Sequence, residues 1–264
     1  MTERTGDGTA FQTRGPADAP VVSLIHGLGL SRALWRDITP VLATRFRVLT
    51  YDLFGHGDSG PTPEPASLTL FSEQLARLLD SVNVDRAAVV GFSIGGMINR
   101  RFALDHGERV TALAILNSPH DRGEEAQELV EGRAAQVRDA GAMATLDAAL
   151  ERWFTPGFRA SRPEEIGRVR AWRAGVDAES YAQAAWVLAN GVRELIGPSP
   201  PIRIPSLVMT SENDSGSTPA MSHAIAAEIA GSETLIVPGL KHLGLMEKPD
   251  VFSRPVLDFL ERTL

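Results

Sequence analysis

Short apolar runs alternate along this sequence with stretches in which apolar residues recur at helical spacing. A run of about four to eight apolar residues is typical of a strand buried on both faces, and spaced apolar residues are typical of helices that pack on a sheet. The predicted strands are Val21–Ile25, Phe46–Tyr51, Ala87–Phe92, Val110–Leu116, Ser206–Thr210 and Thr234–Val237. The predicted helices are Ser31–Ala43, Thr69–Val82, one that begins near Ile94, Pro219–Ile229 and Pro249–Leu260. This alternation predicts an α/β fold with a mostly parallel central sheet flanked by helices.

The alternation stops in the middle of the chain. Residues 119–199 contain helical segments rich in Ala, Arg and Glu but no convincing strand. Proline-rich turns stand on both sides of this segment, with Ser118-Pro119 before it and Pro198-Ser199-Pro200-Pro201 after it, as is typical of linkers. We therefore expect a core domain formed by residues 1–118 and 200–264, and an inserted helical cap, or lid, formed by residues 119–199.

The composition narrows the kinds of function. The 264 residues carry a formal net charge of −7, which argues against a nucleic-acid surface, and no apolar run approaches the roughly 20 residues of a membrane helix. The absence of cysteine excludes disulfides, thiolate metal ligands and a cysteine nucleophile. The polar N-terminal segment lacks the features of a secretory signal. We expect a cytoplasmic protein that acts on a small molecule, without nucleic-acid or membrane partners; the sequence does not predict its oligomeric state.

A G-x-S-x-G motif, Gly91-Phe92-Ser93-Ile94-Gly95, stands between a predicted strand and a predicted helix. This is the context of a nucleophile elbow, a strained turn that exposes a serine hydroxyl at the edge of a sheet. The glycines let strand and helix approach, and the helix N-terminus favours the negative charge that develops during attack. The alternative is a chance Gly/Ser turn, but the flanking elements favour Ser93 as a nucleophile.

A serine nucleophile needs a base, and the base needs a carboxylate that orients it. Of the six histidines, only His242 follows a late predicted strand on a glycine-containing loop, Pro238–His242. Asp214 follows the preceding predicted strand in a polar loop, and Glu212 in the same loop is the alternative acid. We predict Ser93, Asp214 and His242 as a catalytic triad.

The loop His26-Gly27-Leu28-Gly29, which follows the strand predicted at Val21–Ile25, should lie beside the Ser93 turn in a parallel sheet wound this way. The backbone N–H groups of Leu28 and Ile94 are the candidate donors to an oxyanion. We interpret His26 as a structural histidine that braces the turn. Asp52 and His56, on a second glycine-containing loop, are also interpreted as structural rather than as a catalytic pair.

Together these motifs resemble those of the α/β-hydrolase superfamily over nearly the whole chain. The motifs that recur there in this order are HGLG at 26–29, D-x-x-G-H-G-x-S at 52–59, GFSIGG at 91–96, SENDSGSTP at 211–219 and HLGLMEKP at 242–249. The resemblance implies the α/β-hydrolase fold with a helical lid and a triad in the order Ser, Asp, His, with no metal or other cofactor. Dehalogenases and epoxide hydrolases of this fold carry an Asp nucleophile, so Ser93 argues against both.

Within the superfamily, the chain is similar to the 3-oxoadipate enol-lactonase-like hydrolases at Arg32–Trp35, Arg152–Pro156 and Ser180–Ala182. Those lactonases usually have Asn-Ser-Leu-Gly where this chain has His26-Gly27-Leu28-Gly29, the commoner esterase form. The resemblance implies hydrolysis of a small carboxylic ester or enol-lactone through an acyl-Ser93 intermediate. The alternatives are a C–C bond hydrolase that acts on a ring-fission diketone and a non-catalytic ligand receptor of the same fold.

The lid supplies aromatic and basic side chains. Trp153 and Trp186 are the candidate residues of a substrate pocket above Ser93. The basic residues of this stretch are Arg152, Arg159, Arg162, Arg168, Arg170 and Arg173. We interpret them as a solvated face, although one such arginine would fit a lactone that carries carboxylates.

Overall fold

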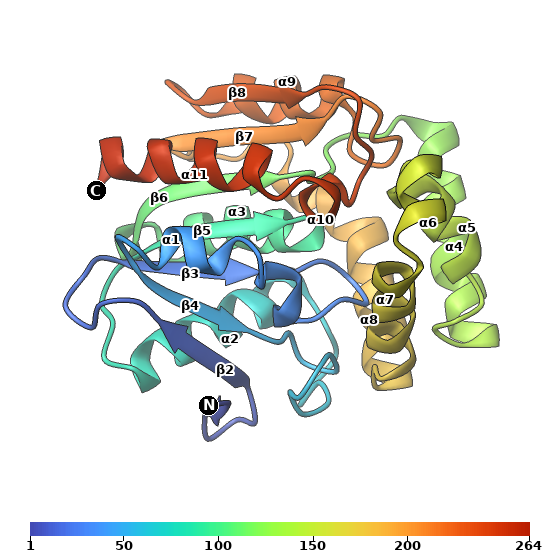
Figure 1. The fold of residues 1–264 in the computed structure, drawn as a ribbon, viewed down its shortest axis with the longest axis horizontal. Helices are drawn as coiled ribbons and strands as arrows, with labels where there is room; N and C mark the ends of the chain where they lie inside the picture. The colour runs from blue at the N-terminus through green and yellow to red at the C-terminus, as the bar shows by residue number, and fades with distance from the viewer.

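The computed structural model describes residues 1–264 and contains one eight-stranded sheet with the order β1-β2-β4-β3-β5-β6-β7-β8 (Figure 1). The strands are β1 (Glu3–Arg4), β2 (Ala10–Arg14), β3 (Val21–Ile25), β4 (Arg47–Tyr51), β5 (Ala87–Phe92), β6 (Val110–Leu116), β7 (Ser206–Ser211) and β8 (Glu233–Val237). Strands β3 to β8 pair in parallel, whereas β1 and β2 pair antiparallel to their neighbours. The carboxyl ends of the parallel strands therefore meet at one edge of the sheet.

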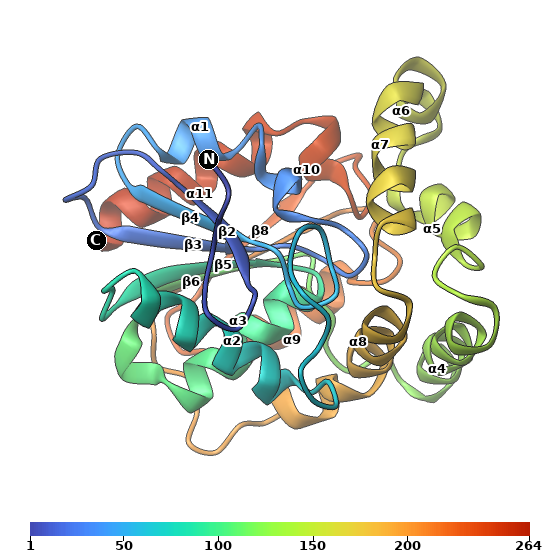
Figure 2. The ribbon, with the colours of Figure 1, turned by 90° about the horizontal axis from the view of Figure 1, so that it is seen from below.

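Helices cover both faces of the sheet, as Figure 2 shows from below. One face carries α2 (Leu68–Ser81), α3 (Ile94–Asp105) and α9 (Pro219–Glu228), and the other carries η1 (Arg32–Trp35), α1 (Thr39–Leu42) and α11 (Asp250–Thr263). Successive residues of a strand enter opposite apolar clusters, so that Val89 packs with the first group of helices and Val90 with the second. Burial on both faces explains why these strands are continuous apolar runs.

A helical segment is inserted between β6 and β7. It consists of α4 (Glu124–Ala140), α5 (Leu146–Trp153), α6 (Pro156–Ser161), α7 (Pro163–Ala174), α8 (Ala178–Asn190) and η3 (Gly191–Leu195). Figures 1 and 2 both show α4 to α8 gathered beyond the carboxyl ends of the parallel strands. The remaining short helices are η2 (Gly107–Arg109) and α10 (Gly244–Glu247). The insertion therefore covers the edge of the sheet where the loops after the strands meet.

The predicted fold class is confirmed: a mostly parallel sheet is flanked by helices and carries an inserted helical segment. The predicted strands from Val21 to Val237 begin and end within one residue of the observed ones. No helix has both the length and the apolar character to cross a membrane.

Two parts of the chain differ from the prediction. The single helix predicted over Ser31–Ala43 is broken into η1 and α1, because Pro40 stands in the first turn of α1 and cannot donate a backbone hydrogen bond to a preceding turn. The antiparallel strands β1 and β2 were not predicted. Along β2, burial falls from Ala10 and Phe11 to an exposed Arg14, so this edge strand lacks a continuous apolar run.

Candidate active site

A cavity of about 150 Å³ lies between the carboxyl edge of the sheet and the inserted helices. From the core it is lined by Gly27, Leu28, Phe92, Ser93, Asp214 and His242, and from the insertion by Trp153, Arg173, Tyr181 and Ala185, among others. The three residues predicted as a triad therefore line one cavity, although they lie on loops after three different strands.

Ser93 occupies a strained turn between β5 and α3. Its backbone has φ 59° and ψ −117°, outside the regions that side-chain-bearing residues prefer, and Ser93 is the N-cap of α3. A Cβ at Gly91 would lie 2.1 Å from the carbonyl oxygen of Gly95, and one at Gly95 would lie 2.4 Å from that of Ile25. Only glycine fits at these two positions, so the motif allows the helix to follow the strand without a connecting loop.

His242 and Asp214 form a buried hydrogen-bonded pair. The His242 Nδ1–H donates to Asp214 Oδ2 over 2.6 Å, and both residues are less than a tenth exposed. The alternative acid, Glu212, points away: its carboxylate is at the surface and accepts a hydrogen bond from the Gly239 N–H at 2.8 Å. The geometry thus joins His242 to Asp214 and not to Glu212.

Three further donors surround the Asp214 carboxylate. The Gly216 and Ser217 N–H groups donate to Oδ1 at 2.9 and 3.0 Å, and the side-chain amide of Asn117 donates to Oδ2 at 2.9 Å. Burial acts to raise the pKa of Asp214, but its interaction with His242 and the hydrogen bonds from His242, Asn117 and Ser217 together hold that pKa below its ordinary value. The carboxylate is therefore ionised beside the imidazole.

Asn117 is a site residue that the sequence reasoning missed. It follows β6, has a positive φ of 46°, and is fully buried. Asn tolerates this left-handed backbone better than most residues. The signal in the sequence was an Asn that ends the apolar run Val110–Leu116, at the same edge of the sheet as the loop of Asp214.

The two predicted oxyanion donors lie on the loop after β3 and at the start of α3. The Leu28 N–H donates to no acceptor within the chain, and Leu28 lines the cavity together with Ser93. Ile94 is the first residue of α3, so its N–H is one of the groups that a helix leaves without an internal partner. Both groups are available to a ligand atom near Ser93.

Two neutral histidines hold the loop of Leu28 against the loop after β4. The His26 Nε2 accepts a hydrogen bond from the Leu53 N–H, and the His56 Nε2 accepts one from the Gly29 N–H, each at 3.0 Å. In both rings Nδ1–H donates to a nearby carbonyl, that of Gly27 or of Phe54. Burial lowers the pKa of His26 to about 4 and that of His56 to about 3. Both rings therefore brace the loops as neutral groups.

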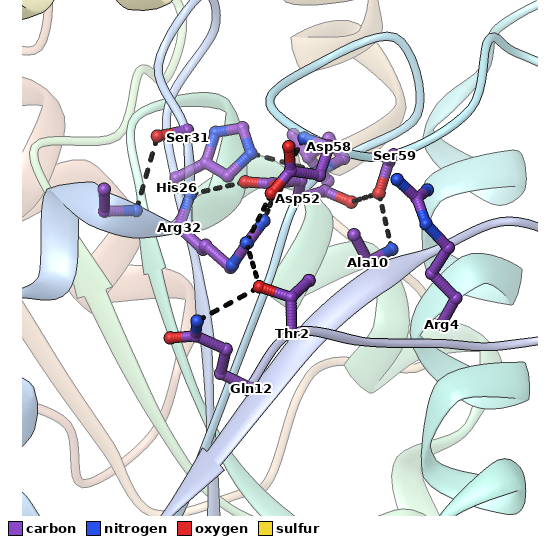
Figure 3. Close-up of polar contacts among 12 residues, drawn as sticks. Thr2, Arg4, Ala10, Gln12, His26, Ser31, Arg32, Asp52, Asp58 and Ser59 are labelled. Atoms are coloured by element: carbon purple, nitrogen blue, oxygen red, sulfur yellow. Dashed lines mark hydrogen bonds and ion pairs between the residues drawn. The ribbon is translucent and has the colours of Figure 1, made fainter.

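Asp52 also joins the loop after β3 to the loop after β4 (Figure 3). Its carboxylate is fully buried, forms an ion pair with the Arg32 guanidinium and accepts hydrogen bonds from the Arg32 N–H at 2.6 Å and the Asp58 N–H at 2.9 Å. Arg32 also contacts Asp58 and Thr2, as the dashed lines in Figure 3 show. No hydrogen bond joins Asp52 to His56, because each is engaged with backbone groups of these loops.

One of the two predicted pocket residues lines the cavity and the other does not. The Trp153 ring lies 6.1 Å from the His242 ring between centroids. The prediction for Trp186 is wrong: this residue is 48% exposed and does not line the cavity. Tyr181, Ala185 and Leu188 are the residues of α8 that line the cavity, and a helix places position 186 about 100° around the axis from position 185.

The end of α5 is fastened to the loop of His242. The Leu243 N–H donates to the Trp153 carbonyl at 2.9 Å. Thr155 donates to the Glu247 carboxylate through its backbone N–H at 2.8 Å and through its hydroxyl at 2.7 Å. These bonds place Trp153 over the cavity and attach the insertion directly to the loop that carries His242.

Comparisons with known proteins agree with the fold. The chain matches the α/β hydrolase fold family over residues 20–249. It is 29% identical over 253 residues to 3-oxoadipate enol-lactonase 2 of Acinetobacter baylyi, a match that covers 96% of this chain and 92% of that protein. The enol-lactonase of Burkholderia xenovorans superposes with a TM-score of 0.88 at 29% identity, covering 97% of this chain and 98% of that one. A thermophilic esterase from Thermogutta terrifontis, with malate bound, gives a TM-score of 0.86 at 26% identity and coverages of 97% and 93%.

The close approach at Gly95 predicts an unusual response to alanine. Gly95→Ala should lower the free energy of unfolding by about 2–3 kcal/mol, because the new methyl meets backbone that cannot move aside. Gly132→Ala, inside α4 with open space around it, should raise that energy by about 0.5–1 kcal/mol through helix propensity. Urea titrations of both variants test this, and a stable Gly95→Ala protein would contradict the packing of the turn.

The low pKa of His56 predicts a loss of stability in acid. The folded chain keeps His56 neutral down to about pH 3, whereas the unfolded chain takes up this proton below the ordinary pKa of 6.5. The stabilisation is therefore complete above pH 6.5 and is lost as the pH falls toward 3. His56→Gln keeps an acceptor for the Gly29 N–H but cannot take up this proton. Between pH 7 and pH 5, the free energy of unfolding measured in urea should therefore fall by about 2 kcal/mol less in His56→Gln than in the unaltered chain. Equal losses in the two proteins would contradict this assignment.

Proposed function

This chain belongs to the α/β-hydrolase fold family, and on that premise we propose that it is a serine hydrolase that cleaves a small carboxylic ester or enol-lactone through an acyl-enzyme intermediate. The observation that carries the proposal is the strained Ser93 in the same cavity as the buried His242–Asp214 pair. A hydroxyl held at a helix N-terminus, a base and an orienting carboxylate are the parts that nucleophilic acyl transfer requires.

In the proposed first half-reaction, Ser93 Oγ attacks the carbonyl carbon while His242 Nε2 takes the hydroxyl proton. Asp214 holds the proton of the imidazole on Nδ1, which leaves Nε2 as the acceptor, and it stabilises the imidazolium that forms. No hydrogen bond joins Ser93 to His242 in the structure, so substrate binding must bring the two side chains together. His242 then donates the proton to the leaving oxygen as the carbonyl re-forms.

The negative charge on the carbonyl oxygen would be met by the N–H groups of Leu28 and Ile94. Preorganised backbone donors of this kind stabilise the tetrahedral intermediate by several kcal/mol (~3 kcal/mol for one donor) without any side-chain charge. In the second half-reaction, His242 takes a proton from water, which attacks the acyl carbon, and then returns that proton to Ser93 Oγ as the acid is released. The substrate, one water molecule and the chain's own groups account for every atom in these steps.

The relatives support this class of substrate. Two of them are named as enol-lactonases, and a third is an esterase with malate bound. The lactonases match this chain over almost its full length, which includes the inserted helices. We also propose that residues 119–199 act as the lid of a core formed by residues 1–118 and 200–264. The bonds from Trp153 and Thr155 to the loop of His242 support a lid that shapes the site.

The nucleophile can be tested directly. A serine-directed fluorophosphonate should modify Ser93, found by mass mapping of peptides, and Ser93→Ala should abolish both labelling and the steady hydrolysis of p-nitrophenyl acetate, by roughly 10⁴-fold or more. Labelling at another serine would contradict the proposed nucleophile. A single stoichiometric burst without turnover would favour a ligand receptor over an enzyme.

The two acidic residues of one loop form a matched pair for the orienting role. Asp214→Asn should lower kcat for p-nitrophenyl acetate by about 10²–10⁴-fold, because the imidazole loses its carboxylate and its fixed tautomer. Glu212→Gln should leave kcat within about threefold, since that side chain is at the surface and bonds only to Gly239. If the Glu212 variant is the more damaged of the two, the assignment of Asp214 fails.

A further inference from the structure

Four arginines line the cavity, and none of them has an acidic partner. Arg122, Arg133, Arg152 and Arg173 all face the space above Ser93, and none takes part in an ion pair with a carboxylate. The only acid in the lining is Asp214, which His242 already engages. A buried cation without an anion is costly, so this excess of positive charge requires an explanation.

The other arginines of the insertion behave differently. Arg159, Arg162, Arg168 and Arg170 point outward, and each is paired with a glutamate or an aspartate. The interpretation of this basic stretch as a solvated face therefore holds for these four side chains. It is wrong for Arg152 and Arg173, which turn into the cavity.

Arg173 is the most deeply buried of the cavity arginines, at 2% exposure. Its guanidinium lies over two aromatic rings, 4.6 Å from the centre of Tyr181 and 5.4 Å from that of Trp153. One nitrogen, Nη1, donates to the Ala142 carbonyl at 3.2 Å, and the buried Nε has no partner. Burial lowers the pKa of Arg173, but a guanidinium remains charged at neutral pH. The Arg173 guanidinium therefore has N–H donors that no acceptor of the chain engages.

The guanidinium also lies next to the proposed oxyanion loop. A Cβ at Gly29 would fall 2.1 Å from the Arg173 Nε and 2.9 Å from its Nη2, so the group is packed directly on the residue after Leu28. An anion bound by Arg173 would therefore be only a few bonds from a carbonyl held at the Leu28 N–H.

We propose that Arg173 binds a carboxylate on the acyl part of the substrate, and that the substrate is an ester or lactone of a dicarboxylic acid. This inference rests on the proposed function for the position of the scissile carbonyl. The planar guanidinium can hold a carboxylate through two parallel hydrogen bonds, and Tyr181 and Trp153 fix its plane. Arg122, Arg133 and Arg152 also line the cavity, and their positive potential attracts an anionic substrate.

The test compares two methyl esters of equal chain length. Monomethyl glutarate carries a carboxylate where methyl pentanoate carries a methyl group, and both release methanol, which proton NMR detects. We expect the unaltered enzyme to favour monomethyl glutarate in kcat/KM. Arg173→Gln should lower kcat/KM for monomethyl glutarate by about 100-fold and change that for methyl pentanoate by less than about threefold. Arg173→Lys keeps the positive charge but cannot form the two parallel hydrogen bonds. Its kcat/KM for monomethyl glutarate should lie between those of the unaltered enzyme and Arg173→Gln.

Arg170→Gln is the matched control, since Arg170 lies on the same helix but is paired with Asp147 at the surface. It should leave both esters unaffected. An equal loss on both esters in Arg173→Gln would show that Arg173 only braces the aromatic residues of the insertion, and would overturn the proposal. A preference of the unaltered enzyme for methyl pentanoate would overturn it as well.

Calorimetric titration with the two esters separates this inference from the proposed function. Monomethyl glutarate should bind Ser93→Ala at least about tenfold more tightly than methyl pentanoate does, and Arg173→Gln in that background should remove the difference. Binding without hydrolysis of any ester would leave the carboxylate site standing while the proposed function fails. If Arg173→Gln does not fold, the titration of Ser93→Ala still decides, because equal binding of monomethyl glutarate and methyl pentanoate overturns the proposal.

Discussion

The left-handed backbone of Ser93 is the constraint on which the rest of the site depends. A serine at φ 59° and ψ −117° is strained, at a cost on the order of 1–3 kcal/mol, and persists only because the structure on both sides determines it. Gly91 and Gly95 remove the side chains that would keep β5 and α3 apart. The turn places the side chain of Ser93 and the first free N–H groups of α3 at the same point. The strained backbone of Ser93, the close packing of β5 on α3 and the free N–H groups of the helix terminus therefore all belong to one turn.

Buried hydrogen bonds between neighbouring loops hold the remaining groups around that point. His26 and His56 join the loops after β3 and β4 reciprocally, and Asn117 joins the loop after β6 to Asp214 after β7. The two kinds of contact have opposite electrostatic effects. The imidazoles accept backbone N–H bonds and are held neutral by burial, whereas Asp214 collects enough donors to remain ionised in spite of burial. The same depth of burial therefore keeps two histidines uncharged and one aspartate charged.

The sequence predicted those features that depend on local pattern. The apolar runs located the parallel strands, and the glycines around Ser93 located the strained turn, because both follow from the chain within a few residues. The proximity of His242 to Asp214 followed from the parallel topology, which brings loops after different strands to one edge. The pairing of Asn117 with Asp214 was missed, because it depends on which strands are neighbours, and β6 adjoins β7 although the whole inserted segment separates them in sequence.

The orientation of the inserted helices was the least predictable part. Trp186 and Arg173 were judged by residue type, which led to an aromatic being assigned to the pocket and an arginine to the surface, and the structure reverses both. The helical period of α7 indicates the inward orientation of Arg173 correctly. It lies four residues after Val169, which is fully buried, and therefore on the inward stripe of α7. Because charged side chains count against burial in any hydrophobic pattern, a basic residue on the inward stripe is easily overlooked. Such a residue is also where a chain places a charge for a ligand, since packing alone would favour an apolar side chain there.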